Sequence, residues 1–220
     1  MTDDQQKRRR GRPKTFDRQR TIELAMDSYW REGVHSLSLN EVCRRARMSK
    51  PSLYREFGDE DGLMEAVLGH YRELIVVPVL EALVAELPFA ELAEMLVAGM
   101  TADHGTPAGC LFTEMRLARS RLGPMSTTRV RAMEQERREA FEIWYRRALE
   151  RGEVDASISP ELAARYIDTQ LATVLVQLGA GEPPEVVRQQ ARLALRVLRA
   201  SREGQGIAPL PPAGGQGRGH

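Results

Sequence analysis

The stretch that most constrains the fold is residues 38–57, SLNEVCRRARMSKPSLYREF, which describes two short helices joined by a tight turn. Apolar residues of the first helix recur at i, i+3, i+4 and i+7, the spacing of one helix face: Leu39, Val42, Cys43 and Ala46. Ser38 followed by Glu41 is a capping-box pattern, so the sequence marks the start of this helix as well as its buried face.

The second helix carries side chains suited to contact with DNA. Ser49 is expected to cap it, and Leu53 and Phe57 are expected to face inward. The side chains left to face outward are Lys50, Ser52, Tyr54 and Arg55. A helix-turn-helix places its second helix in the major groove, with the N-terminal residues of that helix nearest the bases. The pattern therefore predicts binding to double-stranded DNA.

Further helical patterns flank this pair. Upstream lies an apolar stripe that Gly33 ends, as glycine does at a helix C-terminus: Ile22, Ala25, Met26, Tyr29 and Trp30. Downstream, Asp59 is expected to cap a helix that carries Leu63, Met64 and Val67. With these additions, residues from about 16 to 67 resemble the DNA-binding domain of TetR-family transcriptional regulators. The resemblance lies in four blocks in the order and spacing of the family: AMDSYWREG, SLNEV, MSKPSLYREF and GDEDGL.

The resemblance implies specific DNA contacts, carried over by position: Ser38, Arg47, Ser49, Lys50, Pro51, Ser52, Tyr54 and Arg55. Tyr54 resembles a phosphate-contacting tyrosine, while Lys50 or Arg55 could pair with a guanine edge. The alternative is that these are merely solvated residues on a short helix. Two positions depart from the family pattern. Arg47 stands where the turn usually carries glycine, and Glu60 stands where a phosphate-binding lysine often lies.

A basic arm precedes the helices. Within KRRRGRPK, residues 7–14, the candidates for DNA contact are Arg10, Arg12 and Lys14. The Arg-Gly-Arg-Pro core resembles an AT-hook, in which arginines lie along a narrow A·T minor groove. The alternative is a flexible basic tail that adds only nonspecific attraction.

The charge is unevenly distributed along the chain. Residues 1–55 hold 14 Lys and Arg against 7 Asp and Glu, whereas residues 56–220 hold 18 against 24. A basic N-terminal third beside an acidic remainder suits a DNA-reading module attached to a body that avoids DNA. No apolar run reaches the length of a membrane span, and the two cysteines cannot build a disulfide framework. We expect a soluble cytoplasmic protein without a membrane partner.

The fold is expected to be all-α, with about nine helices. The expected domains are a disordered basic arm at 1–15, a three-helix DNA-binding domain at 16–60, a ligand-binding and dimerisation domain at 61–201, and a disordered tail at 202–220. Pro78 should kink or end the fourth helix. The resemblance implies a homodimer through the last two helices, with candidate contacts Ile167, Leu171, Val174, Leu175, Leu178, Val187, Ala191, Ala194 and Leu198. The alternative is that both helices close the monomer's own core.

The middle helices offer candidates for a small-molecule effector site: Met95, Met100, Cys110, Phe112, Met115, Trp144 and Tyr166. Such a stripe of Met and aromatic residues is more often plain core. Cys110 follows a flexible loop at an expected helix start, where a thiolate is stabilised, so a redox or electrophile sensor is an alternative.

The expected function is that of a repressor that binds a palindromic operator as a homodimer and is released by a small molecule. A second alternative is an A·T-preferring architectural DNA-binding protein. We expect no enzyme activity, cofactor or metal site, because the four histidines are scattered and lack metal-ligand spacing: His35, His70, His104 and His220.

Overall fold

The computed structural model describes residues 17–200, and the arm and tail expected at the two ends of the chain lie outside them. Within these residues the fold is all-α, as expected, and the helices number nine when α4 and α5, which run on through η1, are taken as one. The elements are α1 (Arg18–Glu32), α2 (Leu39–Arg45), α3 (Lys50–Phe57), α4 (Glu60–Tyr71), the π-helical η1 (Arg72–Val76), α5 (Val77–Ala82), α6 (Phe89–Met100), α7 (Leu111–Leu117), the 3-10 turn η2 (Arg119–Arg121), α8 (Pro124–Glu150), α9 (Pro160–Gly179) and α10 (Pro184–Arg196).

The helix-turn-helix forms where the sequence marks it, because both helices have side-chain caps. The hydroxyl of Ser38 accepts the backbone N–H of Glu41 at 3.3 Å, and the hydroxyl of Ser49 accepts that of Ser52 at 3.3 Å. The capping box at α2 is only half made. The Glu41 carboxylate instead accepts hydrogen bonds from Arg44 and Arg45, which lower its pKa to about 2.

The turn between α2 and α3 is a Schellman motif. The N–H of Met48 donates to the carbonyl of Cys43 at 3.0 Å, and that of Arg47 donates to Arg44 at 3.2 Å. Arg47 has a φ of 52°, the left-handed conformation that glycine adopts without strain. It is the only non-glycine residue with a positive φ among residues 17–200. The backbone of Arg47 is therefore strained at this turn, where a glycine would not be.

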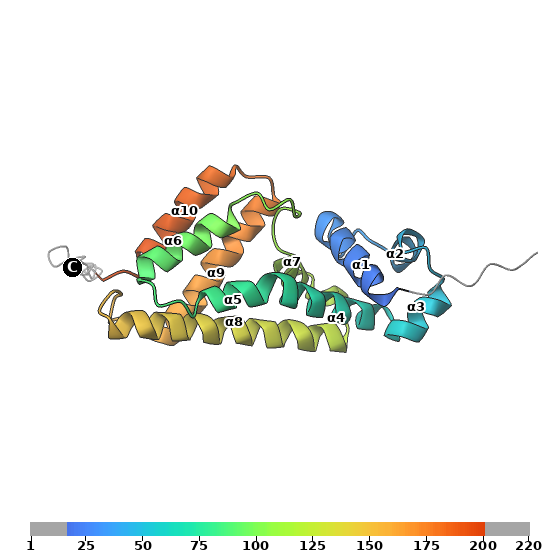
Figure 1. Cartoon of the computed structure of the whole chain (residues 1–220), viewed down its shortest axis with the longest axis horizontal. Coiled ribbons are helices and arrows are strands. Elements are labelled where there is room, and N and C mark those ends of the chain that lie inside the picture. Colours follow the sequence, from blue (N-terminus) through green and yellow to red (C-terminus); the bar gives the residue numbers. More distant parts are fainter. Residues whose placement is uncertain (1–16, 201–220) are drawn as a thin grey trace, which may run out of the picture.

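Pro78 alters the long fourth helix without ending it. Proline cannot donate a backbone hydrogen bond, and the ladder widens just before it. The segment η1 is π-helical, and the N–H of Val77 bonds to the carbonyl of Arg72, five residues back. Helix α5 then continues from Val77 in nearly the same direction (Figure 1).

The molecule is elongated, with α1, α2 and α3 at one end and α6 and α10 at the other (Figure 1). The 27-residue helix α8 runs alongside α4 and α5, and α9 packs against α8 and α10. One buried cluster joins α1–α4 to α7 and the first half of α8. A second cluster joins α6, the second half of α8, α9 and α10. Because the first cluster continues past residue 60, the core itself does not mark the domain boundary expected there.

Candidate nucleic-acid interface

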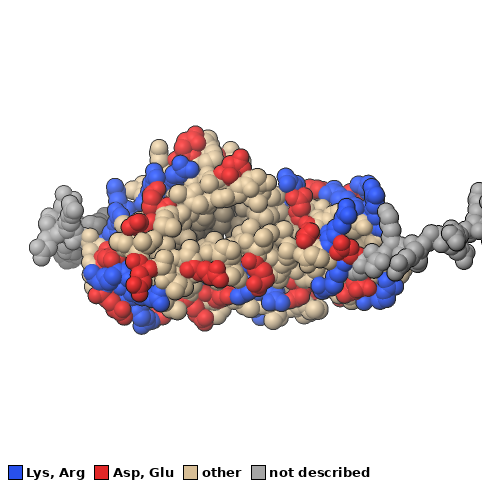
Figure 2. All heavy atoms as spheres, in the orientation of Figure 1, with Lys and Arg blue, Asp and Glu red and all other residues tan. Residues whose placement is uncertain are grey.

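Helix α3 has one face buried in the core and a polar face exposed to solvent. Leu53 is fully buried and Phe57 is 8% exposed, so α3 is held against the core by one side. On the other side, the exposed residues are Lys50, Pro51, Tyr54 and Arg55, with Ser52 half-buried. This arrangement leaves the first turn and one face of α3 free to enter a groove. Figure 2 shows basic side chains, interspersed with acidic ones, at the end of the molecule where α2 and α3 lie.

Arg47 and Ser38 flank this face, and both are exposed. The Ser38 and Ser49 hydroxyls each cap a helix while remaining at the surface. Arg45 has a different role. Its guanidinium donates to Glu32, Glu41 and Ser28, which ties α2 to α1. Arg45 is thus a structural residue, whereas Arg47 has a free surface position beside α3.

Two of the three acidic residues at 59–61 cap helices. Asp59 caps α4 by accepting the N–H of Gly62 at 2.8 Å. Asp61 accepts the N–H groups of Met125 at 2.7 Å and Ser126 at 3.0 Å, at the start of α8. Glu60 is half-buried, and its Oε1 is shielded from water without a hydrogen-bond partner. Glu60 and Asp61 therefore sit largely within the protein, which weakens the expected repulsion of phosphate.

The arm candidates Arg10, Arg12 and Lys14 lie outside the described residues. Within residues 17–200, no group of three or more His, Cys, Asp or Glu side chains is placed to hold a metal ion. Over the same residues, no helix combines the length and apolarity needed to cross a membrane.

The effector candidates are not brought together in one cavity. Cys110, Phe112 and Met115 are buried in the first cluster, whereas Trp144 belongs to the second. Met100 and Tyr166 pack against that second cluster. Met95 is 51% exposed on α6. Sequence periodicity finds apolar helix faces, but it does not show which of two separate cores each face joins.

Cys110 lies in a closed environment. It is 7% exposed, and its Sγ accepts a hydrogen bond from the hydroxyl of Tyr71 at 3.1 Å. Burial raises the pKa of Tyr71 well above its usual value, and the neighbouring Cys110 raises it further. This packing shields the thiol from solvent.

Most of the candidate dimer contacts lie within the monomer's own core: Ile167, Leu171, Val174, Val187, Ala191 and Leu198 are buried. Leu175, Leu178 and Ala194 are half-buried. The alternative assignment, closure of the monomer's core, describes these side chains better. Helical periodicity did not single out the outer faces of α9 and α10, where apolar residues are exposed: Leu162, Val176, Val186, Leu193 and Val197.

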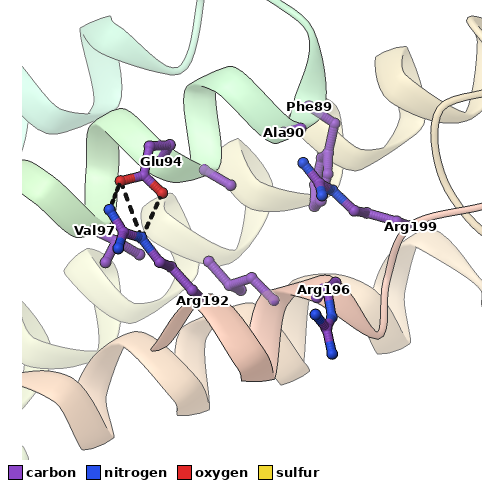
Figure 3. A pocket seen from close by; sticks show the side chains of 9 residues that line it. Phe89, Ala90, Glu94, Val97, Arg192, Arg196 and Arg199 are labelled. Atoms are coloured by element: carbon purple, nitrogen blue, oxygen red, sulfur yellow. Dashed lines mark hydrogen bonds and ion pairs between the residues drawn. The ribbon is translucent and has the colours of Figure 1, made fainter. Parts of the chain in front are cut away.

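Two hollows lie in the helical body, and neither is lined by an effector candidate. One, of about 170 Å³, lies between α6 and α10, where the Glu94 carboxylate accepts hydrogen bonds from Nε and Nη2 of Arg192 (Figure 3). Arg196 and Arg199 stand apart from that pair. The other, of about 380 Å³, lies between α7 and α9.

Comparison with known proteins agrees with this geometry. The model of the tetR family of bacterial regulatory proteins matches residues 22–67, which cover most of α1, all of α2 and α3, and part of α4. The HTH-type transcriptional repressor ComR of Escherichia coli (strain K12) is 34% identical over 108 residues, 47% of this chain and 51% of ComR. The repressor BdcR of the same organism is 32% identical over 117 residues, 52% of this chain and 59% of BdcR.

This chain thus spans about half the length of the curated relatives it matches. A solved structure covers more: the TetR family transcriptional regulator CifR, a cysteine mutant complexed with a 26-bp double-strand operator DNA. It is 28% identical with a TM-score of 0.64, over 84% of this chain and 98% of CifR. The fold and the exposed face of α3 define a helix-turn-helix protein. Residues 22–67 thus form a DNA-binding domain of the TetR type.

Proposed function

We propose that this protein is a sequence-specific DNA-binding transcriptional regulator that represses by occupying a palindromic operator as a homodimer. The observation that supports it most is the exposed polar face of α3 and of the preceding turn. The opposite face of α3 is buried, and the helix lies within the segment matched by the tetR model. The described residues hold no metal-ligand cluster, and their exposed polar groups suit DNA contact better than catalysis. ComR and BdcR are repressors, and a dimer on a promoter blocks polymerase without an activation surface.

The proposed dimer uses the outer faces of α9 and α10. On α10, Val186, Leu193 and Val197 recur at i, i+7 and i+11, which is one stripe of the helix. On α9, Leu162 and Val176 lie fourteen residues apart on one face, with Thr169 and Thr173 between them. An exposed apolar stripe of this kind is typical of a helix-pairing surface. One recognition helix reads too few base pairs to find a site, whereas a twofold dimer reads two half-sites.

Release by a small molecule requires that the effector prefer the conformation that does not bind DNA. Contacts between α4 and α8 could transmit a movement of the C-terminal helices to the helix-turn-helix. Asp61 joins the start of α4 to α8, and Arg129 of α8 donates to Glu65 of α4 at 2.9 Å. Helix α7 packs against α1. A shift of α7 or α8 would therefore move the helices that carry α3.

The decisive experiment is selection of bound sequences from random duplex DNA by the full chain at near-physiological salt. A two-fold palindrome, with half-sites about one helical turn apart, is the expected result. Recovery of A·T-rich DNA without a palindrome would instead support the architectural alternative.

A variant lacking residues 1–14 tests how much the basic arm contributes to DNA binding. We expect weaker binding and a smaller salt slope, because the deletion removes six Lys and Arg. An unchanged slope would exclude a role for the arm.

Redox or electrophile sensing through Cys110 remains the second candidate, although the shielding of its Sγ disfavours it. Its test is the rate of alkylation of the native protein by iodoacetamide. Slow reaction at both Cys43 and Cys110 is expected from their burial.

A further inference from the structure

Helix α7 has two faces with different surroundings. Leu111, Phe112 and Met115 face the first core cluster, which includes α1. Thr113, Arg116 and Leu117, at i, i+3 and i+4, line the pocket shared with α9. The pocket face therefore combines a hydroxyl, a guanidinium and an apolar side chain within one helical turn.

Both polar residues of this face have an unused donor. Thr113 is 4% exposed, and its hydroxyl has no hydrogen-bond partner. Arg116 donates from Nε to Glu134 at 2.9 Å and from Nη2 to Asp168 at 3.1 Å, but its Nη1 is buried without an acceptor. Buried polar groups are nearly always paired, and an unpaired one destabilises the protein. Two such donors on one turn indicate that an acceptor belongs beside them.

The charges around Arg116 do not balance. Three arginines, Arg116, Arg119 and Arg137, share two carboxylates, Glu134 and Asp168. Glu134, Arg137 and Asp168 are all buried. The cluster holds one more arginine than it has carboxylates, although Arg119 is 55% exposed and is therefore partly screened by water. An additional monoanion would complete it.

The rest of the pocket is apolar enough to hold the body of a small molecule. Its volume of about 380 Å³ lies within the range of small-molecule sites. Leu117 is 72% exposed, and Ala172 and Val176 of α9 complete the apolar wall. Thr169 and Thr173 also line it, but their hydroxyls already donate to carbonyls of their own helix at 2.9 Å. They supply surface and no free donor.

We infer that the pocket between α7 and α9 binds a monoanionic carboxylate with a compact apolar body. The carboxylate accepts from the Thr113 hydroxyl and from Nη1 of Arg116 after a small movement of these shielded side chains. The apolar body lies against Leu117, Ala172 and Val176. A phosphate monoester, with its greater charge, would exceed the single positive charge that the cluster leaves unmatched.

The position of the site also gives it a regulatory consequence, which rests on the proposed function. The ligand would wedge α7, which packs against α1, away from α9, the helix that carries part of the proposed dimer face. Occupancy thereby couples to the spacing of the two recognition helices. Carboxylate binding is expected to weaken operator binding.

The test is isothermal titration calorimetry of the full chain with benzoate, alongside benzamide as its neutral analogue and acetate as the head group alone. Benzoate should bind at least tenfold more tightly than either. Thr113→Val should weaken benzoate at least tenfold, the loss expected for a hydrogen bond to a charged group. The variant should unfold at the same or a higher temperature, because the hydroxyl it removes has no partner.

Thr128→Val is the matched control, since it makes the same change outside the pocket and the proposed dimer face, at a hydroxyl that already donates to a carbonyl of its own helix at 2.8 Å. It should alter benzoate affinity less than twofold. Equal binding of benzoate and benzamide, an unchanged affinity in Thr113→Val, or no binding of benzoate would each overturn the inference. Operator binding is measured separately with and without benzoate. A protein that binds a palindrome but no benzoate disproves the site alone, and one that binds benzoate but no palindrome disproves the regulator alone.

Discussion

Asp61 of α4 caps helix α8 in the place where Gly123, the N-cap residue, has no side chain. Its carboxylate accepts the N–H groups of Met125 and Ser126, the two that an N-cap side chain would normally reach. A Cβ at position 123 would collide with that carboxylate. The residue that begins the link from the helix-turn-helix thus completes a helix of the body, across 64 residues of sequence.

The first prediction is that changes at these two positions have non-additive effects on stability. Asp61→Ala should lower the free energy of unfolding by about 1–2 kcal/mol, because α8 loses its cap. Gly123→Ser should also destabilise the native protein, since its Cβ meets Asp61. In the Asp61→Ala background, however, Gly123→Ser should be much less destabilising, because only the Cβ of residue 61 still lies close, 2.8 Å from the new Cβ, and the serine can then cap α8 itself. Urea unfolding of the four proteins measures the cycle, and simple additivity of the two changes would contradict the contact.

The same cap should show in the pH dependence of stability. Burial alone would raise the pKa of Asp61, but hydrogen bonds from Ser126 and Met125 hold it below the usual 3.8. A carboxyl with a lowered pKa in the folded state contributes its full stabilisation above the unfolded value, and loses it as the pH falls through the folded value. The stability difference between wild type and Asp61→Asn should therefore be constant above about pH 5 and shrink below pH 3.8. A difference that persists unchanged at pH 2 would assign the effect to packing.

Replacing Arg47 should raise the stability of the protein and lower its affinity for DNA. Arg47→Gly removes left-handed strain and should raise the free energy of unfolding by roughly 0.5–1 kcal/mol. The same change should weaken operator binding and reduce the salt slope by about one, because a phosphate-binding cation is lost. Arg47→Lys keeps both strain and charge, so it should match wild type in both measurements. Undiminished DNA binding by Arg47→Gly would remove Arg47 from the interface.

The recognition helix should separate base reading from phosphate binding. Arg55→Ala should cost about 1–3 kcal/mol at the preferred operator and relax selectivity at one base position. Tyr54→Phe, which removes only the hydroxyl, should weaken all sequences by a similar factor. Both residues are exposed, so the fold should be unaffected. Fluorescence anisotropy with the operator and its single-base variants distinguishes these patterns.

The dimer should depend on the outer face of α10. Leu193 is 60% exposed, so Leu193→Glu should leave a folded monomer that loses tight operator binding. Ile143→Glu places the same charge at a 51% exposed position on α8 and should remain dimeric. Sedimentation velocity and circular dichroism give the mass and the helicity. A dimeric Leu193→Glu protein with full operator affinity would refute the proposed interface. Leu198→Glu is uninformative here, because Leu198 is buried in the monomer.

The amino-acid sequence was enough to predict most of the helices and the outward face of α3. Ser38 and Ser49 cap α2 and α3 through contacts three residues away, and Leu53 and Phe57 face inward by helical periodicity. Such features are local, so spacing alone predicts them. Arg47 was recognisable as a departure for the same reason, because the left-handed turn is built from neighbouring residues.

The partner of each helix face and of each charged side chain depends on how helices distant in the sequence pack together. From the sequence, Asp61 belongs to an acidic run that would repel phosphate. In the structure it caps α8, because the start of α8 packs beside it. Val187, Ala191 and Leu198 have the periodicity of a dimer face but lie in the monomer's core, and Leu193 and Val197 face outward. The unpaired donors of Thr113 and Arg116 exist only because α7 packs against α9. Periodicity fixes the angle of a residue around its own helix, whereas the packing of distant helices determines whether that angle points to core, solvent or ligand.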